Sequence, residues 1–187
     1  MEEFRVRGYL AARTKTIAVK AGVNEVTLFR HFGNKENLFR EVLHQHLKRI
    51  AGRIAPELPG PDAPVRERLL ALARHLVLVL EENRSTITII LRESSAVPAV
   101  HASLGPLPQG ILAIIAAALV REQKDGYLRP LDPAAAAHAF VAPFFTALVF
   151  LEPLGVPLPY QDREEMVLTL VDLFLAGMQT EKPPAAN

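Results

Sequence analysis

The stretch Ile17-Ala-Val-Lys-Ala-Gly-Val-Asn-Glu-Val-Thr-Leu-Phe-Arg-His-Phe-Gly-Asn-Lys-Glu-Asn-Leu-Phe39 decides the fold of this chain. Gly22 stands where a left-handed residue would end one helix, and Asn24 is a favoured N-cap for the next. That next helix, 25–32, is about two turns long and ends before Gly33. A helix so short is not stable alone, so a scaffold must hold it. The pattern therefore predicts a helix-turn-helix, which places one helix in a groove of DNA.

The same register carries a family resemblance. It is formed by Gly8-Tyr9, Thr14, Ile17-Ala18, Ala21-Gly22-Val23, Thr27-Leu28-Phe29, His31-Phe32 and Asn34-Lys35-Glu36. These residues resemble the DNA-binding signature of the tetracycline-repressor (TetR) family, over residues 4 to about 43. The resemblance implies an all-α regulator of transcription, with a helix-turn-helix DNA-binding domain at 1–45. It also implies a ligand-binding and dimerisation body at 46–187, and a repressor that binds a palindromic operator as a homodimer.

The segment before Gly8 departs from the family pattern. The family normally has a helix of about four turns there, whereas only Met1 to Arg7 stand here. Phe4 keeps the expected core register. We therefore expect a shortened first helix and a head that is less stable than usual.

Charge and composition support a DNA-binding head on a larger body. The 187 residues carry a net charge of +1, but residues 1–60 hold 11 Lys/Arg against 6 Asp/Glu and the remainder is acidic. The basic end is the one that carries the helix-turn-helix, as phosphate binding requires. The chain has no cysteine, which excludes a disulfide, a zinc-thiolate site and a thiolate nucleophile. The N-terminus lacks a secretion-signal pattern, so we expect a cytoplasmic protein.

Helical periodicity continues through the body. We expect helices at about 35–55, 64–82, 109–124, 132–152 and 161–179, with a kink near Pro143. The Thr/Ile alternation at 86–91 is typical of a strand, but no other segment could pair with it, so we expect helix there. Prolines and glycines predict loops at 56–64 and 97–108.

The uncharged run Pro133–Leu151 has 19 residues, close to the ~20 of a membrane span. A membrane helix is therefore the alternative for this segment. Abundant alanine, His138 and Pro143 argue against it, and no other segment is as long. A helix that is apolar all round also suits a position between a core and a subunit interface.

The resemblance places the DNA contacts around the first two helices of the motif. The candidate residues are Arg13, Thr14, Lys15, Asn24, Glu25, Val26, Thr27, Phe29, Arg30, His31 and Lys35. Phosphate binding uses cations, hydroxyls and backbone N–H groups, whereas base edges are reached from the first turn of the second helix. We expect Thr14 to cap the first helix, and Lys35 to add charge where the following helix begins.

Several of these residues have two interpretations. Thr27 can contact a phosphate, a base or a thymine methyl, or bond locally to Asn24. Glu25 either accepts a hydrogen bond from cytosine or is a solvated residue favoured by the helix dipole. Arg30 is a guanine or phosphate contact, or simply exposed. Phe29 lacks the hydroxyl of the family's usual tyrosine, which leaves van der Waals contact. Phe32 should lie in the core.

The body offers candidate residues without a motif. A pocket for an unidentified, apolar effector could be lined by His75, Arg92, Glu93, His101, His138, Phe140, Phe144 and Phe145. For any single one of them, however, core or interface packing of the phenylalanines and exposure of the charged residues is the favoured explanation. The last two helices should form the dimer interface, through Leu148, Leu151, Val167, Leu170, Val171, Phe174 and Met178.

Other function classes find less support. No nucleophile elbow, phosphate loop, His-Glu-x-x-His or dinucleotide fingerprint occurs, so we expect no enzyme and no cofactor. His44 and His46 are two apart on a helix and point to different sides, so no metal site is expected. The alternative from another class is a protein-interaction module whose head no longer binds DNA.

Overall fold

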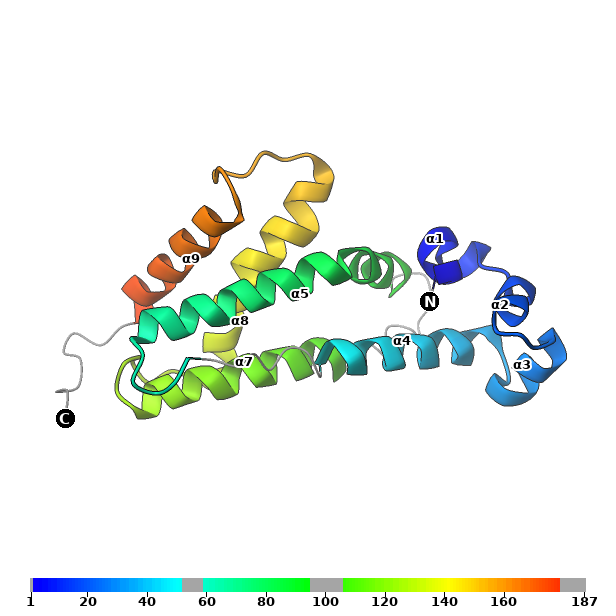
Figure 1. Ribbon diagram of the computed structural model, residues 1–187, viewed down its shortest axis with the longest axis horizontal. Helices are drawn as coiled ribbons and strands as arrows, with labels where there is room; N and C mark the ends of the chain where they lie inside the picture. The colour runs from blue at the N-terminus through cyan, green and yellow to red at the C-terminus, as the bar shows by residue number, and fades with distance from the viewer. Residues whose placement is uncertain (1, 52–58, 95–105, 179–187) are drawn as a thin grey trace. The chain divides into compact units, whose positions relative to one another are not determined.

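The computed structural model covers the whole chain and describes residues 2–51, 59–94 and 106–178. Within these ranges the protein is helical and has no strand, which confirms the all-α prediction (Figure 1). The elements in chain order are α1 (Glu2–Ala11), α2 (Thr14–Lys20), α3 (Glu25–Phe32), α4 (Lys35–Ala51), α5 (Val65–Ser94), α7 (Pro106–Lys124), α8 (Pro133–Phe145), a π turn (Thr146–Leu151), a 3-10 turn (Glu152–Leu154) and α9 (Arg163–Met178).

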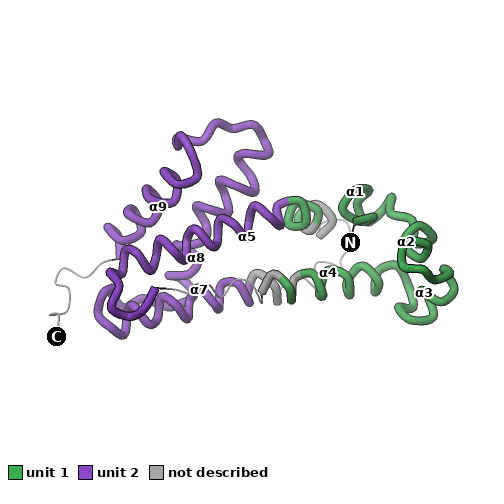
Figure 2. Tube along the Cα trace, in the orientation of Figure 1, with its two compact units in different colours: residues 1–52, 85–108 green, residues 53–84, 109–187 purple. Residues whose placement is uncertain are grey.

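The chain forms two compact units, which Figure 2 colours separately. Unit 1 comprises residues 1–52 and 85–108, and unit 2 comprises residues 53–84 and 109–187. The long helix α5 contributes to both. The domain boundary expected at residue 45 falls within α4.

Unit 1 is built around aromatic residues of α1 and α4. Phe4 is fully buried, and its ring centroid lies 4.7 Å from that of Phe39 and 6.4 Å from that of Tyr9. α1 is broken at Gly8, whose φ of 72° is one that glycine adopts readily. This break lets Tyr9 turn back onto Phe39, at 5.1 Å. The prediction that Phe4 keeps its core register is confirmed.

Four helices begin at Asn or Asp side chains that act as N-caps. Asn24, Asn34, Asp132 and Asp162 each accept a hydrogen bond from the backbone N–H three residues later, at 2.7 to 2.9 Å. Each satisfies one of the N–H groups that a helix start leaves without a partner. The predicted starts of α3, α4, α8 and α9 are therefore confirmed.

α5 is one helix of 30 residues, without the break expected after residue 82. The segment 86–91 is helical, as predicted, and Thr86 is buried. Asn83 is buried too, and its side-chain amide donates to the carbonyl of Val79 at 2.8 Å. This buried polar group is therefore satisfied within the helix, and the helix continues past it. α7 begins at Pro106 because proline fits a helical first turn, so the loop predicted to extend to residue 108 is too long. The rest of that loop, 97–105, lies outside the described residues.

Helix α8 continues through Pro143, where a kink was predicted, and a widened turn follows it. Pro143 has no N–H, so the carbonyl of Ala139 loses its partner in the helix. From Thr146 the chain follows a π turn, in which the N–H of Glu152 bonds to the carbonyl of Ala147, five residues back. The expected single helix, 132–152, is therefore α8 followed by turns of different width.

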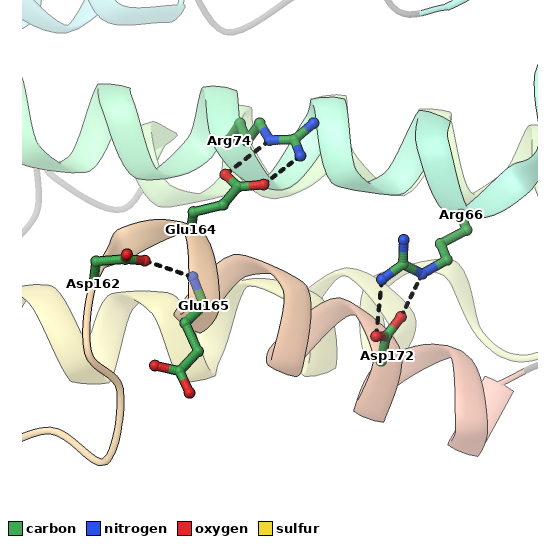
Figure 3. A network of polar contacts seen from close by, with 6 residues as sticks. All are labelled: Arg66, Arg74, Asp162, Glu164, Glu165 and Asp172. Atoms are coloured by element: carbon green, nitrogen blue, oxygen red, sulfur yellow. Dashed lines mark hydrogen bonds and ion pairs between the residues drawn. The ribbon is translucent and has the colours of Figure 1, made fainter.

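In unit 2, two exposed ion pairs join α5 to α9 (Figure 3). Arg66 binds Asp172, with Nε to Oδ1 at 2.7 Å, and Arg74 binds Glu164, with Nε to Oε2 at 3.1 Å. Both pairs are bidentate. Eight residues separate the two partners on each helix, which fixes α5 and α9 in antiparallel register.

Part of the predicted dimer interface is already buried within the chain. Leu148, Val167, Val171 and Met178 are at most 5% exposed, so they belong to the core and offer no surface to a second copy. Leu151, Leu170 and Phe174 are half-buried, and the ring of Phe174 packs edge-on against Phe140 at 5.1 Å. The prediction was wrong for the four core residues because an apolar helix has no polar face to mark its buried side.

The apolar segment Pro133–Leu154 is long enough to cross a membrane, and 39% of its most apolar window is buried inside the structure. Ala136, Ala137, Phe140 and Phe144 lie in the core. Helix α8 therefore has the buried face of a core helix.

Candidate nucleic-acid interface

α2 and α3 are joined by a glycine turn of defined geometry. Gly22 has a φ of 70°, and the N–H of Val23 bonds back to the carbonyl of Ala18 at 3.0 Å. The N–H of Gly22 bonds to the carbonyl of Val19 at 3.1 Å, which completes a Schellman motif. Asn24 then opens α3, its Oδ1 accepting from the N–H of Thr27 at 2.7 Å. The local bond between Thr27 and Asn24 is therefore made, and the backbone N–H of Thr27 makes it. The side chain of Thr27 is half-buried.

α3 has one buried residue and a large exposed surface. Leu28 is 4% exposed and anchors the helix, whereas Val26 is 77% exposed in its first turn. Arg30 and His31 are exposed, and Phe29 is half-buried. Phe32 is half-buried rather than a core residue, because its ring packs edge-on against that of His31 at 4.6 Å near the surface. A shallow depression of about 350 Å³ is lined by Ala21, Val23, Thr27, Leu28, Arg30, His31 and Phe32.

The start of α2 differs from the prediction. Arg13, not Thr14, occupies the N-cap position, and Thr14 is the first helical residue. The Thr14 hydroxyl donates to Oε1 of Glu25 at 2.6 Å, which joins the first turns of α2 and α3. Thr14 therefore does not cap α2. Glu25 is half-buried and accepts a hydrogen bond from the neighbouring helix α2. Neither the cytosine contact nor the solvated residue expected from the sequence included this role.

Lys35 lies at the start of α4 and contacts the end of α1. Its Nζ donates to the carbonyl of Leu10 at 3.0 Å and lies 5.0 Å from the centroid of the Tyr9 ring. Burial raises the pKa of the Tyr9 phenol, and the negative charge of Glu36 raises it further. Lys35 is half-buried, and these contacts join the start of α4 to the end of α1. This structural role is additional to the charge that the sequence predicted it to add for DNA.

Exposed cations surround the two helices of the motif. Arg13 and Lys15 are exposed at the start of α2, and Arg30 is exposed on α3. Lys20, by contrast, forms an ion pair with Glu2 at 2.9 Å, and this pair lowers the pKa of the Glu2 carboxyl. Arg13, Lys15 and Arg30 are thus exposed cations of α2 and α3 and of the residue before α2.

Sequence reasoning missed two contacts in the head. Glu3 is buried, and its carboxylate accepts from the backbone N–H of Arg13 at 3.4 Å and pairs with Arg7 at 3.1 Å. The spacing of Glu3 and Arg7, four residues on one helix, is a signal that could have revealed their pairing. The bond between Thr14 and Glu25 joins two helices and has no comparable local signal.

The candidate pocket residues whose side chains the structure describes do not come together as one set. Phe140 and Phe144 lie in the core with ring centroids 5.9 Å apart, and Phe145 packs on Phe150. His138 is exposed on α8, because it lies on the helix face opposite the buried alanines, so it does not join Phe140 in a pocket. His75 is half-buried on α5. His101 lies outside the described residues, as do the side chains of Arg92 and Glu93.

The head and the body each match a known group of regulators. Residues 1–42 match the bacterial regulatory proteins of the tetR family, and residues 67–179 match the C-terminal domain of AefR-like transcriptional repressors. The HTH-type transcriptional regulator YvkB of Bacillus subtilis is 28% identical over 175 residues, which cover 94% of this chain and 90% of that protein.

Solved structures share the whole fold. The flavonoid-responsive regulator FrrA superposes with a TM-score of 0.76 and 24% identity, over 97% of this chain and 93% of that one. PfmR, a TetR family transcriptional regulator from Thermus thermophilus, gives a TM-score of 0.65 at 23% identity, over 94% and 93%. The two family matches and the likeness to YvkB indicate a transcriptional regulator, not an enzyme. The chain belongs to the tetR family of bacterial regulatory proteins.

Proposed function

We propose that the protein is a ligand-responsive transcriptional repressor that binds a palindromic operator as a homodimer. The observation that carries this proposal is the exposed surface of α3, which is anchored by Leu28 and presents Val26, Arg30 and His31. A capped, exposed helix of this kind is what the major groove of B-DNA admits.

Each side chain of the interface has a role that suits its chemistry. Arg13 and Lys15, exposed at the start of α2, bind phosphate and give the interaction its dependence on salt. Val26 in the first turn of α3 contacts a thymine methyl group. Arg30 and His31, one turn further along, bind a guanine or a phosphate.

The dimer is supported by exposed apolar side chains on α9 and on the segment that follows α8. Leu173 is 64% exposed on α9, and Thr169 and Ala176 lie on the same face at helical spacing. Phe150, after α8, is 47% exposed. Twofold pairing through these surfaces would present two copies of α3 to adjacent major grooves, about 34–36 Å apart. This interface replaces the buried residues that the sequence suggested.

An effector would act by favouring a body shape that changes the spacing of the two heads. The aromatic side chains around Phe140 and Phe144 give unit 2 an apolar interior, which suits an apolar small molecule. The flavonoid response named for FrrA, a structure with the same fold, supports this kind of control. A coupling of about 1–3 kcal/mol between the two sites would change DNA affinity about 5- to 150-fold.

Selection from random duplex DNA, followed by binding measurements at several salt concentrations, tests the proposal. The full chain should enrich a palindromic site, and its affinity should fall steeply as salt rises. Arg30→Ala should weaken binding to that site, whereas Arg121→Ala, which removes an exposed charge at the end of α7, should not.

Two results would contradict the proposal. Failure to enrich any site would favour the alternative of an interaction module whose head does not bind DNA. Equal effects of Arg30→Ala and Arg121→Ala would mean that only net charge matters and that α3 does not read DNA.

A further inference from the structure

We infer that Glu25 reads a cytosine in each operator half-site and that Thr14 is the positioning residue that holds it. The inference rests on the proposed function, because it requires α3 to lie in the major groove. It assigns base specificity to a carboxylate whose charge alone would argue against DNA binding.

The position of Glu25 is fixed from two sides. It is the first residue of α3, where the N-cap Asn24 holds the backbone, and its Oε1 accepts the Thr14 hydroxyl at 2.6 Å. Both side chains are half-buried. A hydroxyl has one hydrogen to donate, so Thr14 cannot at the same time donate to a phosphate. Its role therefore changes from phosphate binding to orientation of Glu25.

The second carboxylate oxygen of Glu25, Oε2, accepts no hydrogen bond from the part of the chain that the structure describes. No cation within the same ranges forms an ion pair with it either. A carboxylate is an acceptor only, so Oε2 can be satisfied on DNA only by a donor.

The major groove offers few donors. The N4 amino group of cytosine and the N6 amino group of adenine donate, whereas guanine and thymine present acceptors at the corresponding edge. Adenine also carries the N7 acceptor beside N6, which repels a carboxylate. Cytosine is therefore the base that suits Glu25.

The charge of Glu25 costs general affinity, because it repels phosphate. The helix dipole at the start of α3 favours a negative charge there, and the exposed cations Arg13 and Lys15 supply attraction to phosphate nearby. A repulsive group that is satisfied only on the correct base raises specificity at the expense of affinity.

The experiment compares base preferences of the full chain and three variants by selection from random duplex DNA and competition binding. The wild type should prefer cytosine over adenine by at least about fivefold at one position of each half-site. Glu25→Gln keeps an acceptor for Thr14, and an amide can bind adenine N6 and N7. It should remove that preference or reverse it toward adenine, with the other positions unchanged.

Thr14→Val should reduce the cytosine preference at the same position without moving it, because Glu25 is then free to rotate. Glu41→Gln is the control, since it removes the same charge from an exposed residue of α4. It should leave every base preference unchanged. A helical circular dichroism spectrum with a sharp thermal transition would show that each variant is folded.

Three outcomes would overturn the inference. If Glu25→Gln keeps the wild-type preference at every position, Glu25 reads no base. If it raises affinity for all sequences alike, the carboxylate only repels phosphate. In both cases the wild type still selects a palindrome and the proposed function stands. If the wild type selects no site, the proposed function and this inference fail together.

Discussion

Arg68 and Glu122 form a buried ion pair that joins α5 to α7, with Nε of Arg68 2.8 Å from Oε1 of Glu122. Their side chains are 6% and 5% exposed. The same guanidinium donates to the carbonyl of Pro61 at 2.8 Å and to that of Ala63, and it lies 5.1 Å from the centroid of the Tyr127 ring. One side chain thus binds the chain before α5, the end of α7 and the turn after it.

Breaking this pair should destabilise unit 2 strongly. Glu122→Gln leaves a buried guanidinium without its counter-charge, and we expect a loss of about 3–5 kcal/mol in the free energy of unfolding. Urea denaturation followed by circular dichroism would measure it. Glu67→Gln, an exposed glutamate one residue before Arg68, is the control and should change little. A loss below about 1 kcal/mol would show that water or relaxation compensates the charge.

Removal of the α3 cap should loosen the head. Asn24→Ala deletes the acceptor of the Thr27 N–H, and we expect a cost of about 1 kcal/mol. Hydrogen exchange of the α3 amides should become faster, while exchange in α8 and α9 stays the same. Asn24→Asp keeps an acceptor and should preserve the wild-type protection. Equal exchange in the alanine variant would mean that the turn holds α3 without the cap.

Glu152 should make the stability of unit 2 depend on pH. Its carboxylate binds Arg163, at 2.6 Å, and also Arg84, and these guanidinium groups lower the pKa of the Glu152 carboxyl. A lowered pKa stabilises the fold above the ordinary value of 4.5, and that contribution is lost as pH falls through the lower, folded-state value.

Glu152→Gln should therefore lower the free energy of unfolding at pH 7 by about 1 kcal/mol or less, since the pairs are partly exposed to solvent. The difference from wild type should shrink below pH 4.5 and vanish in more acidic solution. Urea titrations at several pH values would measure it. A difference that is constant with pH would mean that the ion pairs contribute nothing.

A charge on the exposed face of α9 should disrupt the proposed dimer. Leu173→Asp places an uncompensated carboxylate where two apolar surfaces would meet, so the protein should become monomeric while its helix content is unchanged. Light scattering after gel filtration would report the mass. Leu78→Asp is the matched control, because Leu78 is 47% exposed on α5. Unchanged dimers of Leu173→Asp would place the interface elsewhere.

The elements of the head could be predicted because their signals are local. Asn24 and Asn34 each cap the helix that follows by accepting from the N–H three residues further on, and Gly22 and Gly33 occupy positive-φ positions that glycine adopts readily. Such signals depend on a few neighbouring residues, so the sequence alone reveals them.

Contacts between distant residues could not be predicted in this way. Thr14 and Glu25 lie 11 residues apart on two helices, and their hydrogen bond depends on how those helices pack. The prediction of the dimer-interface residues was partly wrong for a related reason. The segment from α8 through the π turn, and α9, are apolar on most sides, so periodicity could not tell that Leu148 and Val171 face inward while Leu173 faces out.

The π turn Thr146–Leu151 has a consequence for chain length in this segment. A wide turn accommodates one residue more than an α-helix of the same rise, so deleting a single residue there would restore ordinary α-helical geometry instead of opening a gap. Each residue of an α-helix advances by about 100° around the axis. The extra residue therefore sets the direction in which Phe150 projects, and an insertion or deletion at this point would re-aim that ring without disturbing α8.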